Sequence, residues 1–132
     1  MTPKFLTLSE ILEFHEDLID SFGGSHGVRD LGLAESAVAM PQTGMGDEFY
    51  HAFPFEIAAA YAYHLAQNHP FIDGNKRTAL ATALTFLEIN EYPIMGGEEI
   101  LEDAMRSVAS GKLNKKDLSA ILEKTYNDHK RR

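Results

Sequence analysis

His69-Pro70-Phe71-Ile72-Asp73-Gly74-Asn75-Lys76-Arg77 is a nine-residue stretch that carries an imidazole, a carboxylate, a glycine, an amide and two adjacent cations. It separates the two most apolar stretches of the chain, residues 54–67 and 75–90. Both are apolar nearly all round at helical spacing, which is typical of helices buried in the middle of a domain. We therefore expect this signature stretch (residues 69–77) to form a loop and helix start that packing fixes at both ends.

Elsewhere in the chain, apolar residues recur at helical spacing and short breakers separate the segments. We expect helices over about residues 8–22, 31–40, 54–67, 75–90, 98–110 and 115–126. Three of these helices follow residues that favour the N-cap position: Thr7, Asp30 and Asn114. Glu10 completes a capping box with Thr7, and Pro54 suits the first position of its helix.

The predicted fold class is all-α: a compact single-domain helical bundle of about six helices, with the signature loop between two buried central helices. The length of 132 residues favours one domain over residues 1–132, with a core of about 4–126 and a frayed tail at 127–132. Residues 41–53 contain breakers and three aromatic side chains and are expected to form a loop or a small flap. Such a flap could dock a target peptide by strand pairing or could fill the core, and the sequence leaves both open.

Composition excludes several classes of function. The formal charge is −8, from 20 acidic and 12 basic residues, so we expect no direct nucleic-acid partner and no general attraction to anionic lipid. The sequence has no apolar run of membrane-spanning length and no secretory signal at its start, which predicts no membrane association. The absence of cysteine suits a cytoplasmic location and excludes disulfides and thiolate metal sites.

The second half of the signature stretch predicts an anion site. Gly74 allows a tight turn, and the unpaired N–H groups of the helix that follows attract phosphate. Lys76 and Arg77 lie in the first turn of that helix, the unfavourable end for a cation, which makes better sense if an anion binds there. Asn75 could donate to a phosphate oxygen.

The first half predicts a metal ligand and a base. Asp73 could hold a Mg²⁺ that bridges phosphate oxygens, although it could also merely cap the next helix. His69 could take the proton from an incoming hydroxyl. Together these groups indicate phosphoryl or nucleotidyl transfer, in which positioning and charge stabilisation dominate.

The signature stretch resembles that of the Fic/Doc family, in its death-on-curing (Doc-type) branch, and residues 22–37 and 78–87 are similar as well. The resemblance covers about residues 4–125. It implies an all-helical fold whose signature loop binds ATP and Mg²⁺. By position, it implies the following roles: general base for His69, Mg²⁺ ligand for Asp73, anion-binding nest for Gly74 and Asn75, phosphate contact for Arg77, and buried anchor for Phe71.

Lys76 indicates the branch. Nucleotide-transferring Fic enzymes have glycine at this position, which leaves room for the phosphates, whereas death-on-curing toxins have lysine. The resemblance therefore implies a toxin that moves the γ-phosphate of Mg-ATP onto a Ser or Thr hydroxyl of a protein target, a translation elongation factor. AMP transfer to a protein hydroxyl remains an alternative, and so does a non-catalytic binding module that an antitoxin regulates.

Family members are inhibited by a Ser/Thr-x-x-x-Glu-Gly/Asn motif on the same chain or on an antitoxin. Ser119 and Glu123 match its first part, but Lys124 breaks the last position; Ser9 and Glu13 are a similar partial match. Five-residue patterns this loose arise often by chance. We therefore expect an antitoxin protein that inhibits in trans.

Several histidines and charges have simpler interpretations. His64, His69 and Asp73 could converge on a transition metal, but the proline and glycine between them do not form one helix face. His15 lies on an apolar stripe, which favours a core histidine with its polar atoms satisfied. Capping and a local ion pair explain Arg29, Asp30 and Glu35, and we leave these three outside the predicted site.

Overall fold

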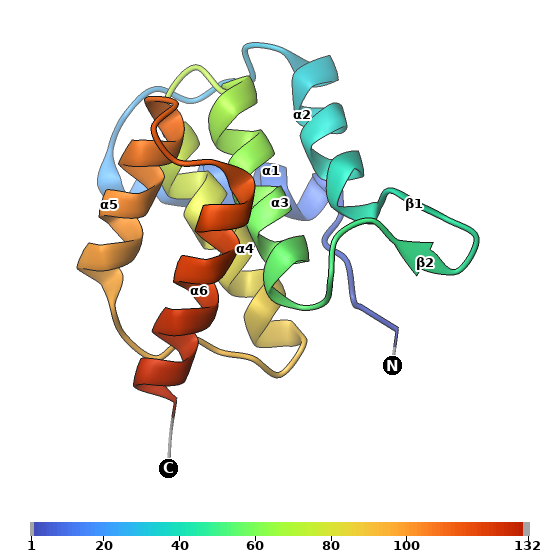
Figure 1. Cartoon of the computed structure of the whole chain (residues 1–132). Coiled ribbons are helices and arrows are strands. Elements are labelled where there is room, and N and C mark those ends of the chain that lie inside the picture. The colour runs from blue at the N-terminus through green and yellow to red at the C-terminus, as the bar shows by residue number, and fades with distance from the viewer. Residues whose placement is uncertain (1, 131–132) are drawn as a thin grey trace.

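The computed structural model describes residues 2–130 and confirms the all-α prediction. The helices of this part of the chain are α1 (Leu8–Phe22), α2 (Leu31–Ala39), α3 (Phe55–Asn68), α4 (Asn75–Ile89), α5 (Glu98–Ala109) and α6 (Lys115–His129). A short 3₁₀ turn (Met40–Gln42) and a two-stranded hairpin, β1 (Gly44–Met45) and β2 (Glu48–Phe49), connect α2 to α3 (Figure 1). None of the helices within residues 2–130 is long and apolar enough to cross a membrane.

The three predicted N-caps are confirmed. The Thr7 hydroxyl accepts from the Glu10 N–H at 3.2 Å, and the Glu10 carboxylate accepts from the Thr7 N–H at 2.9 Å, which is the reciprocal capping box. Asp30 caps α2 and Asn114 caps α6 through the same kind of side-chain acceptor. Pro54 is the N-cap of α3 and not its first residue, so that prediction was wrong by one position.

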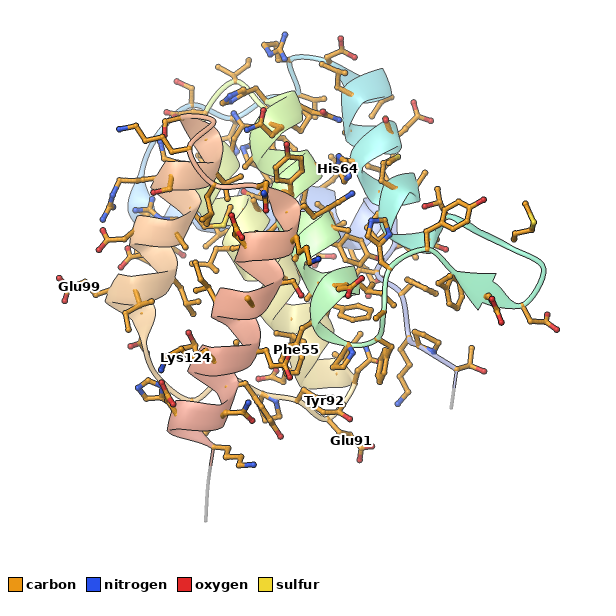
Figure 2. All side chains as sticks on the ribbon, in the orientation of Figure 1. Phe55, His64, Glu91, Tyr92, Glu99 and Lys124 are labelled. Atoms are coloured by element: carbon orange, nitrogen blue, oxygen red, sulfur yellow. The ribbon has the colours of Figure 1, made fainter. Side chains whose placement is uncertain are left out.

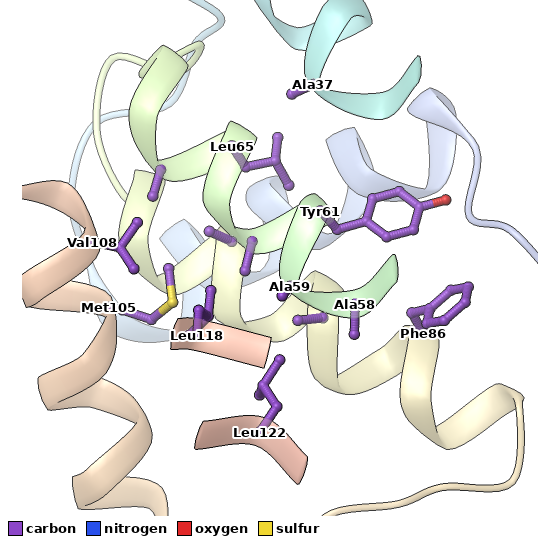
Figure 3. Close-up of a cluster of buried hydrophobic side chains, with 14 of the residues drawn as sticks. Ala37, Ala58, Ala59, Tyr61, Leu65, Phe86, Met105, Val108, Leu118 and Leu122 are labelled. Atoms are coloured by element: carbon purple, nitrogen blue, oxygen red, sulfur yellow. The ribbon is translucent and has the colours of Figure 1, made fainter. Parts of the chain in front are cut away.

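α3 lies at the centre of the bundle, packed against α4, α6 and α2 (Figure 1). Its small residues let the neighbouring helices approach closely, and the larger core side chains fill the layers on either side of it (Figure 3). The hydroxyl of Tyr61, a fully buried residue, pairs with the backbone of Leu6, and burial raises its pKa to about 12. At the start of α3, the rings of Phe55 and Tyr92 lie with centroids 5.8 Å apart (Figure 2).

Residues 41–53 contain the end of the 3₁₀ turn, the β1–β2 hairpin as a small flap, and an irregular segment that leads into α3. Phe49 packs edge-on against Phe5 with ring centroids 5.2 Å apart, and Phe53 packs against Phe86 at 6.3 Å. Phe53 therefore packs against the core, whereas Phe49 remains 39% exposed on the hairpin. The hairpin precedes α3 and the signature stretch follows it, so the 14 residues of α3 separate the two by about 21 Å.

The predicted frayed tail was wrong for residues 127–129, because α6 continues to His129. The His129 imidazole donates to the Thr125 carbonyl at 3.0 Å, and Lys124 pairs with Asp128 at 2.7 Å, so side chains on two faces support the last turn. Residues 131 and 132 of the predicted tail lie outside the described part of the chain.

Candidate functional site

The signature stretch opens onto a cavity of about 670 Å³ between α1, α4 and α5. All six residues predicted for the site line it: His69, Asp73, Gly74, Asn75, Lys76 and Arg77. Apolar side chains from the three helices form much of the remaining wall, among them Phe22, Leu84 and Met105, and α5 adds the charged residues Glu98, Glu102 and Arg106. The structure thus brings the predicted polar groups together at one mouth of a partly apolar cavity, as is usual for small-molecule sites.

The N-terminus of α4 is built to present free backbone donors. Its N-cap is Gly74, in the left-handed region at φ 77° and ψ 21°, which favours glycine. Within residues 2–130, no side chain caps α4, α3 or α5, whereas α1, α2 and α6 are capped. The first N–H groups of a helix have no intrahelical partner, so the α4 start can bind an anion. Lys76 and Arg77 are exposed beside it.

Arg77 has a partner on α1. Its guanidinium lies 4.4 Å from the centroid of the Phe22 ring, a distance typical of a cation–π contact. Phe22 is 65% exposed, and both residues line the cavity. The contact orients the Arg77 side chain along the cavity wall and leaves its positive charge uncompensated by any carboxylate in the described ion pairs.

Asn75 has a structural task that the sequence did not predict. Its amide oxygen accepts from the Phe71 N–H at 2.9 Å, and its amide nitrogen donates to the Phe71 carbonyl at 3.0 Å. Phe71 is 1% exposed, which agrees with the anchoring role that the resemblance implied. The Asn75 side chain therefore closes the loop over its own anchor. Its backbone N–H, at the first position of α4, has no intrahelical partner.

Asp73 lies exposed at the mouth of the cavity. One carboxylate oxygen accepts from the Gly74 N–H at 2.9 Å and the other accepts from the Ser25 N–H at 3.2 Å. Each carboxylate oxygen has about two lone-pair sites, so both can still bind a cation. The site fits a Mg²⁺ ion, which takes one or two carboxylates and completes its shell with phosphate and water oxygens.

His69 is the C-cap of α3 and adopts a left-handed conformation, φ 47° and ψ 55°, which is uncommon for a residue other than glycine. Its side chain is exposed at the cavity, where it can exchange a proton with a bound hydroxyl. Such backbone strain persists only where neighbouring groups hold it in place.

Those neighbouring groups come from the α1–α2 connection, which the sequence-based prediction left outside the site. Residues 27–30 run antiparallel to residues 70–72: the Arg29 N–H donates to the Pro70 carbonyl at 2.7 Å, and the Ile72 N–H donates to the Gly27 carbonyl at 3.1 Å. A Cβ at Gly27 would lie 2.7 Å from the Ile72 side chain. The glycine-rich composition of residues 23–27 was the available signal, because close backbone contact requires it.

His15 is a core histidine, as predicted, and it also contacts two residues of the signature stretch. It is 4% exposed, and its ring stacks on Phe71 with centroids 3.9 Å apart. Its Nε2 lies 2.7 Å from the Asp73 carbonyl oxygen; a carbonyl only accepts, so Nε2 carries the proton. The turn at Asp73 is therefore tied to α1 by a donor that lies 58 residues away in the sequence.

The alternative metal site does not form. His64 faces the other side of α3, where its Nε2 accepts from the Lys115 ammonium at 3.2 Å. Burial, together with the Lys115 charge, lowers the pKa of His64 to about 4. Within residues 2–130, no three His, Cys, Asp or Glu side chains are grouped to hold a metal ion.

Neither partial inhibitory motif reaches the cavity. Ser119 is buried in α6 and Glu123 is exposed on it, while Ser9 and Glu13 are exposed on α1. None of these four residues is among the described residues that line the cavity.

Comparisons with known proteins found a matching family and similar relatives. Residues 5–87 match the model of the Fic/DOC family. The chain is 42% identical over 105 residues to a protein named Toxin Doc from Mycolicibacterium smegmatis, with 77% of this chain and 80% of that protein covered. It is 31% identical over 123 residues to Protein kinase doc from Escherichia phage P1, with 93% and 96% covered.

Proposed function

This chain belongs to the Fic/DOC family, and we propose that it is a Doc-like toxin enzyme that transfers the γ-phosphate of ATP to a Ser or Thr hydroxyl of a protein. The observation that carries the proposal is the uncapped start of α4. There, free backbone N–H groups and two cations, Lys76 and Arg77, share one cavity with a carboxylate and an imidazole.

Each residue has a task in this reaction. The phosphates of ATP lie on the N–H groups of Asn75, Lys76 and Arg77, and the two cationic side chains offset their charge. Asp73 holds the Mg²⁺, which supplies positive charge to the phosphate oxygens when bound.

His69 provides the proton acceptor. As the target oxygen bonds to the γ-phosphorus, its proton passes to an unprotonated imidazole nitrogen of His69. The bond from the γ-phosphorus to the β,γ-bridging oxygen breaks, and ADP leaves with that electron pair. The chain's contribution is positioning and charge stabilisation rather than covalent chemistry, as is general for phosphoryl transfer.

Two considerations favour phosphate over AMP as the transferred group. Lys76 stands where the nucleotide-transferring enzymes of the resembled family have glycine, and its side chain takes up space that the phosphates of an AMP donor need. The phage relative is named a protein kinase. AMP transfer is the second candidate, because the same anion site and base serve attack at the α-phosphorus.

The target and the regulator follow from the resemblance. We propose that the target is a translation elongation factor, which places the reaction in the cytoplasm. We also propose that an antitoxin protein inhibits the enzyme in trans. This is supported by the position of Ser119, Glu123, Ser9 and Glu13, none of which is among the described residues that line the cavity.

ATP labelled at either the α or the γ phosphate, added with the protein to a cell extract, distinguishes the candidates. Label from the γ position on a protein band supports the proposal. Label from the α position supports AMP transfer and overturns phosphate transfer. Binding to a target or antitoxin with no label from either position supports the non-catalytic module.

A further inference from the structure

We propose that Arg29 is a positioning residue that holds the catalytic imidazole of His69 in its working orientation; this rests on the proposed role of His69. Arg29 lies in the α1–α2 connection, 40 residues before His69. It touches neither the anion site nor Asp73 in the described contacts.

The Arg29 guanidinium binds the end of α3 through two hydrogen bonds. Its Nε donates to the His69 carbonyl at 2.7 Å, and one terminal nitrogen donates to the Asn68 carbonyl at 2.9 Å. The last carbonyls of a helix have no intrahelical partner and carry the negative end of the helix dipole. A planar cation with forked donors satisfies two of them at once, which a lysine ammonium on its flexible stem does not reproduce.

The backbone of Arg29 fixes the guanidinium in turn. The N–H groups of Arg29 and Asp30 donate to the Pro70 carbonyl at 2.7 and 3.1 Å. Arg29 thus binds three successive carbonyls, those of Asn68, His69 and Pro70, from one position. The peptide units on both sides of His69 are therefore anchored to the same residue.

This arrangement acts at the point where the chain is strained. His69 has a positive φ of 47°, and for a residue with a Cβ this conformation costs free energy unless the surroundings compensate. Rotation of φ or ψ at His69 swings the imidazole relative to the α4 start. A displacement of about 1 Å of a reacting group can cost on the order of 100-fold in rate, so loss of the two side-chain hydrogen bonds should act on catalysis more than on substrate binding.

The test compares Arg29→Gln and Arg29→Lys with wild type. We expect Arg29→Gln to lower kcat by roughly 10- to 100-fold while the KM for ATP stays within about twofold, because the anion site on α4 is untouched. Arg29→Lys keeps the charge but loses the fork, and it should recover part of kcat. Lys124→Ala is the matched control: it removes an exposed cation of α6 whose partner is Asp128, and it should leave kcat unchanged.

An NMR readout separates the positioning role from the proposed reaction. The imidazole signals of His69, assigned among the six histidines with a His69→Ala variant, should shift and broaden in Arg29→Gln, while the thermal midpoint and far-UV spectrum remain near those of wild type. An unchanged kcat, or unchanged His69 signals, would overturn the positioning role. If wild type transfers no phosphate, the proposed function fails, and the NMR comparison still decides whether Arg29 fixes the imidazole.

Discussion

Replacing Asn75 by Ala removes both hydrogen bonds that close the signature loop over Phe71, at 2.9 and 3.0 Å. Each such bond contributes roughly 1 kcal/mol net, and more when the group left behind is buried. Phe71 is 1% exposed, so its N–H and carbonyl lose partners that water replaces only partly. We expect Asn75→Ala to lower the free energy of unfolding by about 2–3 kcal/mol, which corresponds to a fall in Tm on the order of 10 °C for a chain of this size.

Urea unfolding followed by circular dichroism measures this change in the free energy of unfolding. Asn114→Ala, which removes one helix cap, is the reference variant for its size. Asn114 caps α6 with one side-chain acceptor, so its loss should cost about 1 kcal/mol. Asn75→Asp is a second comparison. It keeps an acceptor for the Phe71 N–H but sets a carboxylate oxygen against the Phe71 carbonyl, and at neutral pH it should be at least as unstable as Asn75→Ala.

The opposite pattern would refute this reasoning. If Asn75→Ala unfolds at the wild-type urea concentration but binds a non-hydrolysable ATP analogue much more weakly in calorimetry, the side chain acts on the nucleotide and does not close the loop. If Asn75→Ala is less stable than Asn114→Ala, and its affinity at a temperature where it is fully folded stays near that of wild type, the loop-closing role is supported.

Two further predictions concern the surroundings of the site and the far side of α3. A Cβ at Gly24 would lie 2.7 Å from the Asp73 carboxylate, whereas a Cβ at Gly23, which also has a positive φ, would meet open space. We therefore expect Gly24→Ala to lower the phosphate-transfer rate at least about tenfold more than Gly23→Ala does. Equal rates in the two variants would contradict the Asp73 contact. The pKa of His64, lowered from 6.5 to about 4 by burial and by Lys115, means that between these pH values the unfolded chain binds a proton that the folded chain does not. The free energy of unfolding should therefore fall as the pH is lowered through this range. In His64→Gln, the urea midpoint should depend less on pH than in wild type. An identical pH dependence in wild type and His64→Gln would argue against a buried neutral His64.

The sequence predicted the helices because their signals are local. Capping residues such as Thr7, Asp30 and Asn114 act within three or four positions, and the apolar periodicity of each helix reports its own buried face. The predicted end of the last helix was wrong because of contacts that are also local. α6 runs past residue 126 because Lys124 pairs with Asp128 and the His129 ring binds the preceding turn.

Six of the residues of the signature stretch that line the cavity were named from the sequence, because they lie close together and their chemistry is dense. The residues that hold the signature stretch in place from other parts of the chain were not predicted. Arg29, Ser25 and His15 reach the stretch from 40 to 58 residues away, and no local pattern distinguishes an arginine that caps a distant helix from one in a local ion pair. Asn75 was assigned to phosphate from its residue type and from the resemblance, and neither signal indicated that its side chain binds the backbone of Phe71.

The central claim is that His69 is the base in a transfer of phosphate to a protein hydroxyl. The most direct measurement is the initial rate of γ-phosphate incorporation into a target protein by wild type and by His69→Ala, with both proteins shown to be folded and to bind the ATP analogue equally. We expect His69→Ala to be slower by roughly 100- to 10,000-fold, the usual contribution of a positioned general base. A His69→Ala variant that transfers phosphate at the wild-type rate would contradict the account.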